Sequence, residues 1–225
     1  EHAERTDLNE PSGDAADSYH RYGEDIRMLA DAGLRMYRFS IEWARIEPAE
    51  GCFSKAQLLH YRHMIDVCHQ NGVEPMVTLN HMTLPQWLAA KGGWLNADAV
   101  DYFARYVRYV MTILHDVTWV CTINEPNMVA LTRGGTEGSD FVAASLPAPD
   151  PDISVTLVEA HRKAREILSG NPRIKSGWTI ACQAFHAMPG CEREMEEYQY
   201  PREDYFTEAA AGDDFIGVQA YLRTF

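Results

Sequence analysis

The chain has 225 residues, of which 46% are hydrophobic and 24% are charged, with a net charge of -13 at pH 7. This balance is typical of a globular protein and excludes a disordered or fibrous chain. The acidic excess repels phosphate backbones and anionic lipids, so nucleic acid is not expected as a partner. No segment holds the roughly 18 consecutive apolar residues of a membrane span, so no membrane association is expected.

The five cysteines are widely spaced and form no Cys-x-x-Cys motif. Neither a disulfide framework nor a zinc knuckle is therefore indicated, and a cytoplasmic location is expected. The chain starts without an initiator Met, which leaves open a preceding signal peptide or strand. The sequence does not define the oligomeric state.

The first elements follow in chain order. Residues 1–17 are polar and contain Pro11 and Gly13, so they are expected to form a loop. Apolar residues at helical spacing predict a helix over 19–32, with Gly33 as a C′ residue of positive φ. The β-branched and aromatic run 34–41 predicts a strand buried on both faces.

The same alternation of helix and strand then repeats to the end of the chain. Predicted helices cover 55–70, 97–115, 154–168 and 203–210, and predicted strands cover 73–80, 117–123, 174–181 and 215–220. Five alternating strands favour parallel β/α units, either in an open doubly wound sheet or in a closed barrel. No G-x-G-x-x-G fingerprint follows any strand, which favours the barrel. We therefore expect one α/β domain over 1–225, a truncated (β/α)8 TIM barrel.

Polar residues stand where several predicted strands end. They are Arg38, Asn80, His81, Asn124, Glu125, Gln219 and Tyr221. The carboxyl ends of barrel strands carry the active site, so these side chains are expected to converge on one mouth.

Glu125 is the strongest candidate, because it follows an apolar strand and precedes Pro126, which ends the ladder. Glycoside cleavage requires a carboxylic acid beside the leaving oxygen and a second carboxylate beneath the anomeric carbon. The amides of Asn80 and Asn124 and the ring of His81 suit a hydroxyl-rich ligand. The alternative for Glu125 is a solvated carboxylate at a strand end.

Other residues allow two interpretations each. A guanidinium in an apolar strand needs an acidic partner, so Arg38 belongs either to the site or to a structural ion pair. His81 could be a satisfied core histidine, and Trp87 and Trp94 could stack on a sugar or pack beneath a loop.

No metal or cofactor is expected. His60, His63 and His69 share one helix but form no compact ligand face. The acidic residues Glu192, Glu194, Glu196 and Glu197 are interpreted as a solvated helix face, because they lack the Gly and alternating oxygen ligands of a calcium loop.

Five segments together resemble glycoside hydrolase family 1, the β-glucosidases and β-galactosidases with a (β/α)8 barrel. They are Tyr19–Ile26, Tyr37–Ile46, Thr78–Pro85, Thr122–Pro126 and Asp214–Tyr221, in the order of the family. The resemblance implies that the chain holds about strands 2 to 6, and that the first strand and the last two strands with the nucleophilic Glu lie outside it.

The resemblance also implies roles for single residues. Glu125 is the expected acid/base, and Asn124 and His81 are expected to bind the sugar. Arg38 and Tyr221 are expected to orient and hydrogen-bond the nucleophile. The implied activity is retaining hydrolysis of terminal non-reducing β-D-glycosyl residues of a small carbohydrate, without a cofactor.

Two departures concern the choice of glycone. Met82-Thr83 stands where many members have Trp-Asp, and Gln219-Ala220 stands where Asn-Tyr is common. Two alternatives remain open, an endo-acting barrel glycosidase of the same clan and a catalytically inert carbohydrate-binding half-barrel. The isolated fragment is expected to be inactive.

Overall fold

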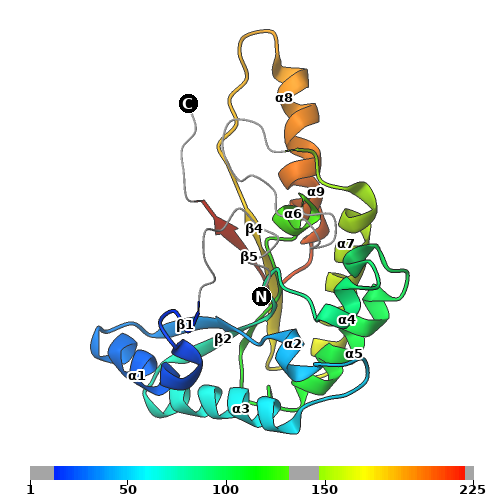
Figure 1. Ribbon diagram of the computed structural model, residues 1–225. Helices are drawn as coiled ribbons and strands as arrows, with labels where there is room; N and C mark the ends of the chain where they lie inside the picture. Colours follow the sequence, from blue (N-terminus) through cyan, green and yellow to red (C-terminus); the bar gives the residue numbers. More distant parts are fainter. Residues whose placement is uncertain (1–12, 132–146, 221–225) are drawn as a thin grey trace.

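A computed structural model describes residues 13–131 and 147–220 (Figure 1). One parallel sheet runs through it in the strand order β1-β2-β3-β4-β5. Its strands are β1 (Met36–Ser40), β2 (Glu74–Asn80), β3 (Trp119–Asn124), β4 (Lys175–Ala181) and β5 (Phe215–Gln219). The sheet curls into part of a (β/α)8 barrel, which confirms the predicted fold class.

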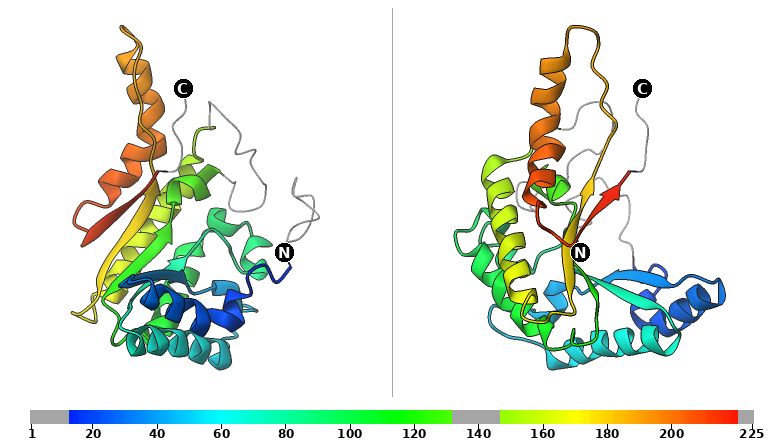
Figure 2. Two further views of the ribbon diagram at one scale, coloured as in Figure 1. Left: turned by 90° about the vertical axis from the view of Figure 1, so that its left-hand side faces the viewer. Right: turned by 180° about the vertical axis from the view of Figure 1, so that it is seen from behind.

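Helices connect the strands and lie along the outer side of the curved sheet (Figures 1 and 2). The longer ones are α1 (Ser18–Asp31), α3 (Lys55–Gln70), α5 (Ala99–Met111), α7 (Pro151–Leu168) and α8 (Glu192–Gln199). The shorter ones are α2 (Trp43–Ile46), α4 (Gln86–Ala89), η2 (Gly93–Leu95), α6 (Pro126–Val129), η4 (Tyr200–Asp204) and α9 (Tyr205–Ala209). Helix α8 projects away from the sheet.

Capping residues explain two differences between the predicted and observed helix bounds. Asp150 accepts hydrogen bonds from the backbone amides of Asp152 and Ile153, so α7 begins at Pro151 rather than at 154. Asn96 accepts from the amide of Asp98 in an Asx turn, which delays α5 to Ala99 instead of 97. The prediction that this helix runs to 115 is also wrong, because it ends at Met111.

Strand β1 corrects a second expectation. The central strands β2, β3 and β4 are largely buried, as is usual for parallel strands covered on both faces. Strand β1 is mostly half-buried or exposed instead. Its first residue, Met36, is 47% exposed, and Leu34 just before the strand is 50% exposed. The prediction of a strand buried on both faces is therefore wrong for 34–41, because β1 has a neighbour on one edge only in the described sheet.

Two local features determine how β3, β4 and β5 pack near their carboxyl ends. The β3–β4 register shifts between Cys121 and Asn124, and a bulge of this kind re-aims the side chains that follow it. A Cβ on Gly217 of β5 would lie 2.5 Å from Cγ2 of Thr179 on β4, so glycine is required for this close approach. Both features position Thr179 beside Asn124.

Candidate active site

Glu125 lies directly after β3 in a strained backbone conformation. Its φ of 49° and ψ of 59° are left-handed, which costs a non-glycine residue roughly 1–2 kcal/mol. Its amide donates to the carbonyl of Thr179 at 2.7 Å, and its own carbonyl accepts from the amides of Met128 and Val129 in α6. The sheet on one side and the helix on the other hold this conformation, and the side chain is largely buried.

Asn124 is fully buried, and its amide orientation follows from its partners. Its Oδ1 accepts hydrogen bonds from Nη1 of Arg38 at 3.0 Å and from Oγ1 of Thr179 at 3.1 Å. A guanidinium can only donate, so the atom facing Arg38 must be the carbonyl oxygen. The Nδ2 donor then points at Nε2 of His81, 3.3 Å away.

His81 must accept this bond through the lone pair of Nε2, so its ring is neutral with the proton on Nδ1. His81 is exposed as a residue, while its Nε2 faces Asn124. Desolvation and the charge of Arg38 lower the pKa of His81, and Glu42 opposes them. This direction agrees with the neutral tautomer.

Arg38 contacts three neutral oxygens. They are Oγ1 of Thr78 at 3.2 Å, Oδ1 of Asn124 at 3.0 Å and Oε1 of Gln219 at 3.4 Å. Within residues 13–131 and 147–220, no carboxylate lies at ion-pair distance from this guanidinium. The acidic partner expected from the sequence is therefore not among the described residues.

Gln219 connects β5 to the same group of residues. Its Nε2 donates to Oε1 of Glu125 at 2.7 Å, while its Oε1 accepts from Arg38. We call the joined residues the strand-end network, and its members are Arg38, Thr78, His81, Asn124, Glu125, Thr179 and Gln219. Each of the five strands contributes to this network, as the convergence of strand ends predicts.

The remaining candidates divide into three cases. Asn80 is buried but donates to the carbonyl of Thr83 at 2.8 Å, so it belongs to the loop rather than to the network. Trp94 is fully buried and Trp87 donates to the carbonyl of Glu47, so both pack beneath the loop after β2. Tyr221 lies outside the described residues.

Sequence reasoning misses Thr179. Threonine is an ordinary strand former, and Thr179 stands two residues before the end of β4. Only the pairing of Thr179 with Asn124 across β3 and β4 shows that its hydroxyl fixes the amide.

The three histidines of α3 diverge. His60 stacks on Tyr19, His63 contacts Tyr22, and His69 lies 3.6 Å from Asp116. In the part of the chain that the structure describes, no group of three His, Cys, Asp or Glu side chains is placed to hold a metal ion. The four glutamates of α8 are exposed, which agrees with a solvated helix face. Among the described helices, none is long and apolar enough to cross a membrane.

A curled parallel sheet with an Asn-Glu pair at one strand end is the architecture of a barrel glycosidase. The family model "Glycosyl hydrolase family 1" matches residues 2–145, and the chain belongs to this family. This confirms the resemblance read from the five sequence segments.

Known proteins agree with this assignment. Beta-glucosidase A of Acetivibrio thermocellus is 43% identical over 124 residues, which are 53% of this chain and 28% of that protein. Lactase/phlorizin hydrolase of Rattus norvegicus is 36% identical over 178 residues, which are 77% of this chain and 9% of that protein. The crystal structure of beta-glycosidase BGL167 superposes with a TM-score of 0.84 at 38% identity and covers 96% of this chain. The chain spans 58% of the length of that structure.

Proposed function

We propose that the chain is part of a retaining β-glycosidase of the β-glucosidase type, which hydrolyses terminal non-reducing β-D-glycosyl residues. The observation that carries the proposal is the carboxylate of Glu125, held by a 2.7 Å hydrogen bond from Gln219 among the polar side chains at the strand ends. Family membership and the similarity to Beta-glucosidase A support the substrate class.

Glu125 serves as the acid/base in this proposal. In the first step its carboxylic acid gives a proton to the glycosidic oxygen as the bond to the anomeric carbon breaks, and a second carboxylate bonds to that carbon. In the second step the ionised Glu125 takes a proton from the water that attacks the same carbon and releases the second carboxylate.

The nucleophile is a glutamate outside this chain, roughly 5 to 5.5 Å from the acid/base as retaining chemistry requires. Arg38 supports this placement, because its described partners are neutral oxygens and its charge is uncompensated among them. A carboxylate beside it would gain a charge-assisted hydrogen bond. Arg38 and Tyr221 are thus proposed to orient the nucleophile.

Asn124 and His81 are proposed to bind one sugar hydroxyl between them. The Nδ2 donor and the Nε2 acceptor are 3.3 Å apart, a long contact for a direct hydrogen bond. A hydroxyl both donates and accepts, so it can donate to His81 and accept from Asn124. The sugar thereby satisfies both groups.

The test is Glu125→Gln in the full-length protein, which keeps the shape of the side chain but removes its proton. We expect kcat/KM for cellobiose to fall about 10²- to 10⁴-fold, because its leaving group needs a proton. For 2,4-dinitrophenyl β-glucoside, whose leaving group needs no proton, the loss in the rate of the first step should be much smaller. Glu194→Gln on exposed α8 is the matched control.

Unchanged turnover of cellobiose in Glu125→Gln contradicts the proposal. Cleavage of long β-glucan chains without activity on aryl monoglucosides supports the endo-acting alternative instead. Sugar binding by the full-length protein without any turnover supports a catalytically inert binding protein.

A further inference from the structure

Gln219 stands between the two charged groups of the strand-end network. Its Nε2 donates to Oε1 of Glu125 at 2.7 Å, and its Oε1 accepts from Nη2 of Arg38 at 3.4 Å. A guanidinium only donates, which fixes the carbonyl end of the Gln219 amide toward Arg38. The NH2 end of the Gln219 side chain must then face the Glu125 carboxylate, and the contact with Glu125 is shorter than the contact with Arg38.

The amide acts as an uncharged spacer. A guanidinium in direct contact with a carboxylate favours its ionised form, which opposes the protonation that a general acid requires. No ion pair joins Arg38 to Glu125 among the described contacts, because Gln219 separates them. An amide donor tolerates both states, since Oε1 can accept its hydrogen bond whether the proton is on Oε2 or has been transferred.

The backbone of Gln219 is well placed to hold this position. It is the last residue of β5, pairs with Ala181 of β4, and its carbonyl accepts from the amide of Cys182 at 2.9 Å. Gly217, two residues earlier on the same face, allows β5 to lie against Thr179. A side chain on a strand locked in this way has a precise direction.

We propose that Gln219 is a positioning residue for the acid/base, which holds Oε1 of Glu125 and thereby assigns the proton transfer to Oε2. This inference rests on the proposed role of Glu125. The length of the glutamine side chain matters, because asparagine is one methylene shorter, about 1.5 Å, and cannot contact both Arg38 and Glu125 from the same backbone position.

The experiment compares Gln219→Ala, Gln219→Asn and Gln219→Glu in the full-length protein. For Gln219→Ala we expect kcat/KM on cellobiose to fall about 10- to 100-fold, because a misplaced acid transfers its proton poorly. On 2,4-dinitrophenyl β-glucoside, whose leaving group needs no proton, we expect less than about a 3-fold loss. Gln219→Asn should show the same selective loss, since it cannot span both partners.

Gln219→Glu adds a pH readout with a nearly isosteric side chain. A second carboxylate against Oε1 of Glu125 disfavours loss of the catalytic proton, so the alkaline limb of kcat/KM should move to higher pH. Gln199→Ala is the matched control, because Gln199 also donates to a carboxylate, Asp204, at 3.0 Å but lies on α8 outside the network. Gln199→Ala should leave kcat/KM on both substrates and its pH profile unchanged.

The outcomes separate this inference from the function itself. Equal losses on both substrates, or an unmoved alkaline limb in Gln219→Glu, overturn the positioning role. If Glu125→Gln shows the leaving-group dependence and the Gln219 variants do not, only the inference on Gln219 fails. If Glu125→Gln lacks it, the proposed function fails. Circular dichroism melting reports folding, and the isosteric Gln219→Glu carries the test if Gln219→Ala does not fold.

Discussion

Nη1 of Arg38 donates to Oδ1 of Asn124 at 3.0 Å, and this contact decides which way a fully buried amide faces. The orientation of the Asn124 amide in turn determines its contact with His81, because Nδ2 at the opposite end of the amide donates to Nε2 of His81. Strand β1 therefore sets the tautomer of a ring that follows β2, through a side chain at the end of β3.

Asn124→Asp tests this relay of contacts from Arg38 through Asn124 to His81. A carboxylate keeps the acceptor for Arg38 but loses the donor to His81, and its negative charge favours a protonated ring. We expect the pKa of His81, which desolvation and Arg38 hold below its usual value, to rise. NMR titration of the His81 ring measures the change, with Asn171→Asp at an exposed turn as control. A pKa of His81 that is unchanged or lower contradicts the relay.

Gly217→Ala tests the contact between β4 and β5. The added methyl meets Thr179 at 2.5 Å, and overpacking of this kind costs about 1–3 kcal/mol of unfolding free energy. Displacing Thr179 should also loosen Asn124, so activity of the full-length protein should fall. Gly23→Ala is a control that should change the unfolding free energy in the opposite direction. Gly23 lies inside α1, and a Cβ there would have its nearest contact at 3.7 Å. Alanine at this position should stabilise the protein by about 0.5–1 kcal/mol. Urea unfolding measures both, and a neutral Gly217→Ala contradicts the close approach.

The fold was largely predictable where local chemistry fixes it. Helix α3 begins and ends as predicted, at Lys55 and Gln70, because Ser54 caps its first turn by accepting from the amide of Gln57. Gly33 takes the predicted positive φ of 81° after α1. Helix α5 shows the limit, because Ile113 and Leu114 continue the apolar pattern and are buried although they lie beyond its end. Periodicity reports burial there, not helix.

The candidate site was predictable as a set of strand ends but not as a network. Parallel strands bring their carboxyl ends together whatever their register, so the convergence of Arg38, Asn124 and Glu125 needs topology alone. The bond from Thr179 and the bridge through Gln219 depend on the β3 bulge and on the close approach at Gly217. Both arise from packing between segments far apart in the sequence.

Thr122→Val tests a buried chain of hydrogen bonds behind the site. His161 is fully buried, with Nδ1 2.7 Å from Oγ1 of Thr122 and Nε2 3.1 Å from Asp213. Valine keeps the shape but leaves Nδ1 without its partner, which should cost about 1–3 kcal/mol.

Thr156→Val on the outer side of α7 is the matched control, since its hydroxyl also contacts the protein, the carbonyl of Asp152. Urea unfolding compares the two variants, and equal effects contradict a special cost at Thr122. Burial lowers the pKa of His161, although Asp213 opposes it. The contribution of neutral His161 to the free energy of unfolding should therefore be fully present above the ordinary histidine pKa near 6.5 and be lost as the pH falls through the lower folded value.

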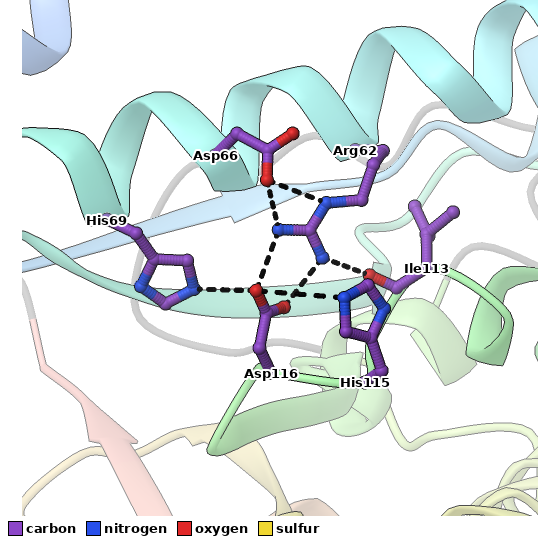
Figure 3. Close-up of polar contacts among 6 residues, drawn as sticks. All are labelled: Arg62, Asp66, His69, Ile113, His115 and Asp116. Carbon is purple, nitrogen blue, oxygen red and sulfur yellow. Dashed lines mark hydrogen bonds and ion pairs between the residues drawn. The ribbon is translucent and has the colours of Figure 1, made fainter.

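An ion-pair cluster centred on Arg62 joins α3 to the loop before β3 (Figure 3). Because this loop precedes β3, the cluster lies at the end of the sheet opposite the candidate site. Nη1 and Nη2 of Arg62 donate to the two oxygens of Asp116 at 2.6 and 3.0 Å, and Nη1 also donates to the carbonyl of Ile113. His69 and His115 lie farther from Asp116, at 3.6 and 3.9 Å. Residues at this face of a barrel serve stability rather than chemistry.

Asp116→Asn tests the cluster through its pH dependence. Burial raises the pKa of Asp116, but the hydrogen bonds and charge of Arg62 outweigh it and lower the pKa below 3.8. The ion pair therefore contributes fully above that value and is lost as the pH falls through the folded pKa. We expect Asp116→Asn to cost about 1–2 kcal/mol at pH 7, after allowance for solvent screening. The difference in unfolding free energy between the variant and the wild type should narrow below about pH 4. Urea unfolding at pH 7 and pH 3 measures it, with Glu166→Gln, which breaks an exposed pair with Lys163, as the control. A gap that stays constant with pH means that Asp116 acts by packing and not by its charge.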